Sequence, residues 1–385
     1  MRRGRCGRCG LEGFGADATA WRNAVGARVP VYDRLLAAAV EIFERPRGGL
    51  EHAARDRVEA AWRERRSAAS YDRPLLLLAA LRAEALRTGP RHPLFAAIGA
   101  IAIDPETATG AALAGALADA PARLFVDLAT RSVQTNETSR AVAWLWPAAL
   151  AGCADPDRAV ALFDIGCSAG LNLIADGLPA PWTDLAGSAL PIAAAARIVT
   201  RRGFDAHPLD VARDDDVVWL RACVWPGETG RLQRLDRAIA AFRVAAAAPN
   251  PPQLQIGDAT DVPARIERTA GDLPAKTLLL AYQTVMCDYL ADGVKSRYLA
   301  GMTAWVAAEI AGGPRRVWIE LEAATDVLAD QSPLPMALTA HLADPAAGTR
   351  ALTLARCNSH PDRLAPDAAA VAAFVAAFVA ETTRK

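Results

Sequence analysis

Apolar side chains recur at helical spacing through the first third of the chain. Between residues 31 and 43 they return in the i, i+3, i+4 pattern of a helix, and Pro46-Arg47-Gly48-Gly49 ends that run. A second apolar stretch, Pro74 to Leu81, opens with a proline, which the first turn of a helix tolerates. We therefore predict an all-helical domain over residues 1–130, with a basic tail over 1–15 that need not fold. Whether this domain covers a substrate or is a purely structural bundle stays open.

Short apolar runs separated by polar turns replace the helical pattern after residue 130. Strands are predicted at 162–165, 198–200, 254–256, 277–283 and 316–321, of which 162–165 and 277–283 should be buried, with further strands near 337–342 and 351–355. Amphipathic helices fall between them, and an Ala-rich helix at 366–382 follows the last strand. Strands that alternate with helices predict an α/β fold with a parallel sheet. We assign residues 131–385 to this second domain.

A glycine-containing turn follows the first predicted strand, in the stretch Leu162-Phe163-Asp164-Ile165-Gly166-Cys167-Ser168-Ala169-Gly170-Leu171-Asn172. Gly166 lets the backbone leave the strand and approach a ligand, and the small residues 168–170 keep the helix entrance open. The dinucleotide fingerprint is absent, because its later glycines would fall on Ser168 and Leu171. A strand-to-helix turn whose glycines serve only packing remains the alternative.

Other polar groups follow later strands or precede a helix. Asp205 is the best candidate to hydrogen-bond a ribose, with Asp210 as the second choice, because nucleotide-binding α/β folds place an acid just past the second strand. Asp258 ends another short strand in a Gly-Asp-Ala sequence. Residues 131–140 form a polar island before an apolar helix; a capping role accounts for it, and a ligand carboxylate also suits such a helix N-terminus.

Composition narrows the function classes. Lys+Arg and Asp+Glu number 43 each, and this balance argues against a nucleic-acid or anionic-membrane partner. The 7 cysteines are scattered and odd in number, which favours a reducing cytoplasm over a disulfide framework. No apolar stretch matches a secretory signal or a membrane span. Cys6 and Cys9 form a single C-x-x-C, half of a zinc knuckle, and we expect no metal site.

The order of the motifs resembles the bacterial domain-of-unknown-function family 2332, which is itself similar to class I methyltransferases that use S-adenosyl-L-methionine (SAM). The series runs over most of the chain and consists of residues 134–137, 164–172, 203–210, 219–226 and 257–259. The resemblance implies a Rossmann-like sheet of about seven strands with a helical N-terminal part. Gln283 departs from a histidine that is frequent in the family, Cys167 from a common alanine, and Cys357-Asn358-Ser359-His360-Pro361 from the usual ending of the last strand.

This resemblance implies a SAM-dependent methyltransferase that acts on a small-molecule acceptor. The residues expected to bind the cofactor are Gln134, Asn136, Asp164, Gly166, Cys167, Ser168, Ala169, Gly170, Asn172, Asp205, Asp258 and Ala259. Tyr282, Gln283 and Glu137 are the catalytic candidates, and no residue stands out as a general base. Cyclisation or aminocarboxypropyl chemistry that releases 5′-methylthioadenosine, and SAM binding without catalysis, are the alternatives. The oligomeric state stays open.

Overall fold

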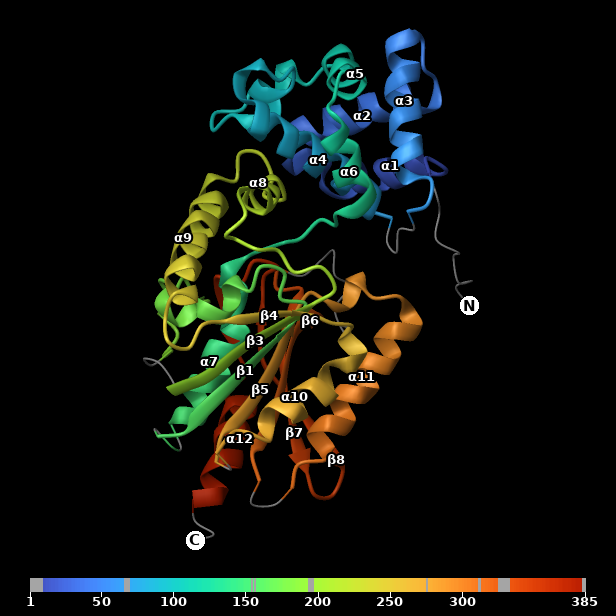
Figure 1. Cartoon of the computed structure of the whole chain (residues 1–385). Coiled ribbons are helices and arrows are strands. Elements are labelled where there is room, and N and C mark those ends of the chain that lie inside the picture. The colour runs from blue at the N-terminus through green and yellow to red at the C-terminus, as the bar shows by residue number, and fades with distance from the viewer. Residues whose placement is uncertain are drawn as a thin grey trace. The chain divides into compact units, whose positions relative to one another are not determined.

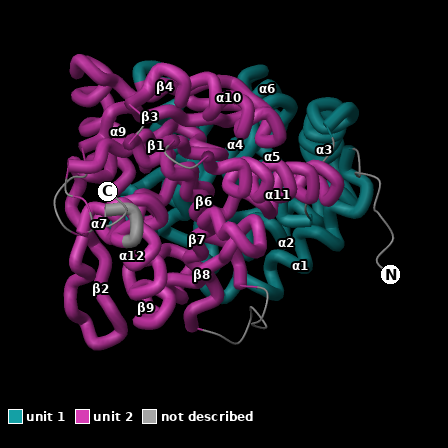
Figure 2. Tube along the Cα trace, turned by 90° about the horizontal axis from the view of Figure 1, so that it is seen from below, with its two compact units in different colours: residues 1–135, 212–233 teal, residues 136–211, 234–385 magenta. Residues whose placement is uncertain are grey.

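The computed structural model describes residues 10–65, 70–153, 155, 157–192, 197–274, 276–310, 313–324 and 333–382. The chain forms two compact units, residues 1–135 with 212–233, and residues 136–211 with 234–385 (Figure 2). The predicted division into 1–130 and 131–385 did not place the segment 212–233 with the helical residues. Cys6 and Cys9 lie outside the described part of the chain.

The first unit is helical in its described residues, as the periodicity predicts. Its helices are α1 (Phe14–Val25), α2 (Pro30–Glu44), α3 (Gly49–Trp62), α4 (Asp72–Thr88), α5 (Gly110–Ala118), α6 (Ala122–Thr130) and α8 (Asp214–Ala222), with the short turns η1 (Gly26–Arg28), η2 (Gly89–Arg91), η3 (Phe95–Gly99) and η4 (Pro105–Thr107). Helix α4 is buried along most of its length and carries Arg73 into the interior, where its guanidinium lies 2.6 Å from the Asp17 carboxylate. Helix α8 belongs here because Asp216 pairs with Arg131 at 2.8 Å.

The second unit is built on a mixed nine-stranded sheet in the order β2-β9-β8-β7-β6-β5-β1-β3-β4 (Figure 1). The strands are β1 (Ala159–Ile165), β2 (Thr183–Asp184), β3 (Arg197–Asp205), β4 (Gln253–Ile256), β5 (Leu278–Thr284), β6 (Arg315–Ala323), β7 (Met336–Asp344), β8 (Gly348–Cys357) and β9 (Arg363–Pro366). The α/β class is confirmed. The expected count of about seven strands is wrong, because the short strands β2 and β9 extend one edge.

Five of these strands are parallel and follow one another as β4-β3-β1-β5-β6. Taken in chain order they read 3-2-1-4-5, which is the order of a doubly wound nucleotide-binding sheet. Strands β7, β8 and β9 continue the sheet in antiparallel fashion. The direction of winding reverses between β1 and β5. In open α/β sheets, ligands bind at the carboxyl ends of the strands beside such a reversal.

Helices cover both faces of the sheet in this unit (Figure 1). They are α7 (Val142–Gly152), α10 (Val262–Ala270), α11 (Asp292–Ala307) and α12 (Ala368–Thr382), with α9 (Thr229–Ala246) entering from the first unit and the short turns η5 (Thr138–Ala141), η6 (Leu171–Gly177), η7 (Ala259–Asp261) and η8 (Cys287–Tyr289). No helix in the described residues is long and apolar enough to cross a membrane.

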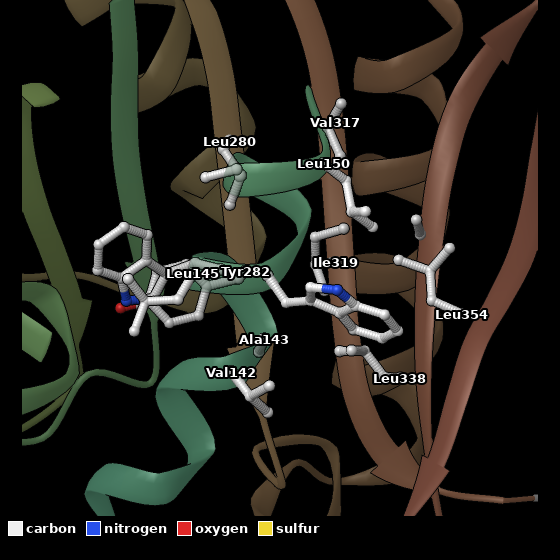
Figure 3. Packing of buried hydrophobic residues seen from close by; sticks show 14 of the residues in the cluster. Val142, Ala143, Leu145, Leu150, Leu280, Tyr282, Val317, Ile319, Leu338 and Leu354 are labelled. Atoms are coloured by element: carbon white, nitrogen blue, oxygen red, sulfur yellow. The ribbon is translucent and has the colours of Figure 1, made fainter. Parts of the chain in front are cut away.

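Side chains that point alternately to the two faces of the sheet form two separate hydrophobic cores. Leu162 and Leu280 face α7 and α12 in one core, which Figure 3 shows from close by. Phe163 and Leu279 face α10 and α11 in the other core. Because successive side chains of a strand point to opposite faces, near-continuous apolar strands are what a sheet covered on both sides requires.

Candidate functional site

The glycine turn leaves β1 in a left-handed backbone conformation. Gly166 has φ 76°, Ser168 has φ 52° and Gly170 has φ 68°. The turn is fixed to the end of β3, since the Gly166 amide donates to the Phe204 carbonyl at 2.8 Å and the Ser168 amide donates to the Asp205 carboxylate at 2.8 Å. The predicted loop therefore exists, and its backbone is held at the carboxyl edge of the sheet.

Packing accounts for part of the glycine pattern. A Cβ at Gly166 would lie 2.5 Å from Cγ of Met286, and a Cβ at Gly170 would lie 2.5 Å from Cδ2 of Leu254. Met286 follows β5, so the first glycine lets the two loops beside the winding reversal touch. Cys167, predicted at the ligand, is buried, and its Sγ lies where a side chain at Gly203 would need to be.

Asn136 from the polar island reaches this turn. Its Nδ2 donates to Oγ of Ser168 at 2.8 Å, which brings two predicted cofactor residues together. Asn172 follows the turn, and its carbonyl accepts from Nε1 of Trp144 at 2.7 Å. Gln134 belongs to the first unit, where its backbone hydrogen-bonds with the buried Cys223 thiol.

Two predicted acids end the neighbouring strands. Each oxygen of the Asp205 carboxylate accepts one backbone N–H at 2.8 Å, from Ser168 and from His207. An ionised carboxylate offers about four acceptor positions, so roughly half of them remain available. Asp258 is exposed after β4. Hydrogen bonds from the Thr260 hydroxyl and amide to its Oδ1, at 2.6 and 2.8 Å, lower the pKa of Asp258.

Asp164 and Tyr282 face each other across β1 and β5 beneath the turn. Both are buried, with 3 % and 0 % of their surface exposed, and Tyr282 packs among the residues under α7 (Figure 3). Burial raises the pKa of the Asp164 carboxyl to about 7, and the nearby Asp205 charge raises it further. Tyr282, a predicted catalytic residue, does not reach the surface.

Gln283, the second catalytic candidate, is also fully buried. Its Oε1 accepts from Nε1 of Trp318 at 3.1 Å and from the Tyr298 hydroxyl. Its Nε2 donates to Oε1 of Glu320 at 3.3 Å and to Oε1 of Glu322 at 3.1 Å. The side chain thus connects β5 with β6 and α11 and has no surface left for a substrate.

The acidic residues of this network were not predicted from the sequence. Glu320 and Glu322 stand two positions apart on β6, and this i, i+2 pattern within an apolar strand was the available signal. Burial raises the pKa of Glu322 to about 7, and the same carboxylate accepts the Met286 amide at 3.0 Å. Nε2 of His341 lies 2.7 Å from Glu320. The network therefore holds the loop that contacts Gly166.

Glu137, the third catalytic candidate, is 2 % exposed and is bound by an arginine. Nε and Nη2 of Arg234 donate to its two oxygens at 3.1 and 3.0 Å, and the Ser139 amide donates at 3.3 Å. Within the described residues, no group of His, Cys, Asp and Glu side chains is arranged to hold a metal ion.

Comparison with known proteins identifies a family. The family described as uncharacterized protein conserved in bacteria (DUF2332) matches residues 23–365. This match confirms the resemblance to that family, and the description names no activity. No curated protein matches the sequence.

Proposed function

We propose that this chain, which belongs to the DUF2332 family, is a SAM-dependent methyltransferase that acts on a small-molecule acceptor. One observation carries the proposal. The glycine turn follows β1, Asp205 ends β3 and Asp258 follows β4, and these three neighbouring parallel strands lie beside the point where the winding of the sheet reverses. Nucleotide-binding α/β folds receive their ligand at this edge.

The residues at this edge suit an adenosine. Asp205 keeps acceptor positions for ribose hydroxyls after binding two backbone amides. Ile256, at the end of β4, is 73 % exposed and offers an apolar surface of the kind that an adenine ring covers. Oδ2 of the adjacent Asp258 is available to an amino group, because both Thr260 hydrogen bonds reach Oδ1.

The turn itself suits the methionyl part. Residues 166–170 present backbone groups near the Asn136 amide, and Asn136 is oriented by its hydrogen bond to Ser168. Bound SAM would supply a methyl group that the sulfonium already activates. The protein would then need to align the acceptor and exclude water, which requires position rather than a strong base.

The three catalytic candidates are too deeply buried to touch a substrate. Gln283 and Glu137 are hydrogen-bonded to other side chains, and all three candidates, Tyr282 included, are only 0 to 2 % exposed. We therefore assign them as positioning residues. Gln283 and Glu322 hold the loop at Met286 against the glycine turn, and Asp164 keeps its proton to about neutral pH because burial raises its pKa.

Calorimetric titration of the full chain with SAM and S-adenosylhomocysteine tests the cofactor assignment. We expect Asp258→Ala to weaken SAM binding about tenfold. Asp258→Ser should weaken it similarly while it keeps a cap for η7, which separates ligand contact from loop stability. Asp272→Ala alters another exposed aspartate and should have no effect. Unchanged SAM affinity in both Asp258 variants would contradict the assignment.

Product analysis by mass spectrometry then identifies the reaction. Release of S-adenosylhomocysteine with a panel of small acceptors supports methyl transfer. Release of 5′-methylthioadenosine would instead support attack on another carbon of SAM. Binding without turnover across the panel would favour a SAM-binding protein that is not an enzyme.

A further inference from the structure

A second candidate site lies within the sheet unit. A pocket there is lined by Thr138, Ala175, Leu178, Pro179, Pro181, Trp182, Arg234 and Arg237. None of these residues belongs to the set assigned to the cofactor. The pocket is nevertheless connected to the glycine turn, since η6 begins directly after Gly170 and contributes Ala175 to the wall.

Arg234 presents a fixed positive charge to this pocket. Its guanidinium is held by the two hydrogen bonds to Glu137, yet 36 % of the side chain is exposed. Those bonds use Nε and Nη2, so the N–H groups of Nη1 remain available to a ligand. An arginine anchored in this way loses little conformational entropy when it binds an anion.

Arg237 adds a second positive charge to the pocket. It stands three residues after Arg234 on α9, so both side chains lie on one face of the helix. Arg237 is exposed and forms no ion pair or hydrogen bond within the part of the chain that the structure describes. Glu137 balances one of the two arginines, and the pocket therefore keeps an excess positive charge.

Most of the other lining residues form an apolar wall. Nε1 of Trp182 donates to the Ser139 carbonyl at 2.7 Å, which fixes the orientation of the indole. Leu178, Pro179 and Pro181 complete this wall. An apolar wall with a few convergent polar groups is the usual composition of a small-molecule site.

We propose that this pocket binds small carboxylic acids with a compact apolar or aromatic body. The carboxylate pairs with Arg234 and Arg237, and the body packs on the wall formed by Leu178 and Trp182. Planar guanidinium groups bind carboxylates in two-pronged fashion, which selects this anion by shape as well as charge. The further assignment of such an acid as the methyl acceptor rests on the proposed function, whereas the binding itself does not.

Saturation-transfer NMR on the full chain, with benzoate as the ligand and uncharged benzamide as its control, tests the proposal. Benzoate should bind, benzamide should bind at least about fivefold more weakly, and added salt should weaken benzoate alone. Arg237→Gln should weaken benzoate about fivefold or more. Arg268→Gln removes another exposed arginine of the same unit, on α10, and should leave benzoate binding unchanged.

Three results would overturn the proposal. Equal binding of benzoate and benzamide would show that charge is not recognised. Equal effects of the Arg237 and Arg268 variants would show that the charge acts elsewhere. Displacement of benzoate by S-adenosylhomocysteine would make the pocket part of the cofactor site. If SAM fails to bind at all, the proposed function fails, while the benzoate measurements keep their meaning.

Discussion

Replacement of Asp164 by asparagine should make the protein more stable at neutral and alkaline pH. The Asp164 carboxyl is 3 % exposed, and burial raises its pKa from 3.8 to about 7. Asparagine has nearly the same shape and keeps one oxygen acceptor. The substitution therefore removes the ionisation of this group while it preserves the packing around it.

The direction of this pH dependence follows from the number of protons bound in the native and in the unfolded state. In the unfolded chain Asp164 loses its proton near pH 3.8, whereas in the native protein it keeps the proton until about pH 7. Between these values the native state binds more protons, so the free energy of unfolding falls as pH rises. The stabilisation that the protonated Asp164 carboxyl gives to the native state is fully present below pH 3.8 and is lost by about pH 7. The gap between the two pKa values corresponds to about 4 kcal/mol.

Urea unfolding at a series of pH values from about 4 to 8.5, with wild type and variant side by side, measures this effect. The difference in the free energy of unfolding should grow by about 4 kcal/mol in favour of Asp164→Asn across that range. The difference between variant and wild type cancels the contributions of other titrating groups, including Glu322, whose pKa is also about 7. Asp272→Asn, at an exposed position, should show no such trend.

Carboxyl carbon NMR provides the direct check on the same group. With labelled aspartate, one resonance should titrate near pH 7 and should be missing from the Asp164→Asn spectrum. A resonance assigned to Asp164 that titrates near pH 4, or a stability difference that stays constant with pH, would refute the argument from burial.

Two further substitutions test other contacts in the structure. Gly166→Ala should lower the free energy of unfolding by about 1–3 kcal/mol, since φ is 76° and the new Cβ would meet Met286. Gly177→Ala is the control, because a Cβ added there meets no other atom, and it should change the free energy of unfolding little. Thermal unfolding measures both variants. Asp17→Asn should lower the free energy of unfolding by about 3–5 kcal/mol, because it leaves the buried guanidinium of Arg73 without its anion. Urea unfolding measures this loss, and a value below about 1 kcal/mol would contradict a buried pair.

The main elements could be predicted from local pattern, because burial on one or both faces leaves a period in the sequence. The helices before residue 130 and the strands at β1, β5 and β6 follow this rule. The edge strand β2 could not be predicted, since a strand of two residues carries no period, and β9 was missed although β4, of the same length, was predicted. The placement of residues 212–233 with the helical unit depends on distant ion pairs such as Arg131–Asp216, which no local pattern reveals.

The candidate site was predicted in part. The order of the motifs placed Asn136 and Ser168 in one site, and the structure brings them within 2.8 Å. The pattern misjudged exposure at Tyr282 and Gln283, because polar residues at the end of a strand were taken to face a ligand. Helices α7 and α11 cover the two faces of the sheet there, so these side chains are enclosed instead.

Glycines at a strand-to-helix turn cannot by themselves distinguish a ligand site from close packing. Gly166 is required by Met286 whether or not a ligand binds, since its Cβ would lie 2.5 Å from that side chain. The distinguishing feature is the set of acceptors that the fold leaves unused. A purely structural Asp205 would need only its two backbone amides, and a purely capping Asp258 only Thr260. Their remaining oxygen positions, at the ends of adjacent strands, are the reason to seek a hydroxyl- and amino-bearing ligand at this edge.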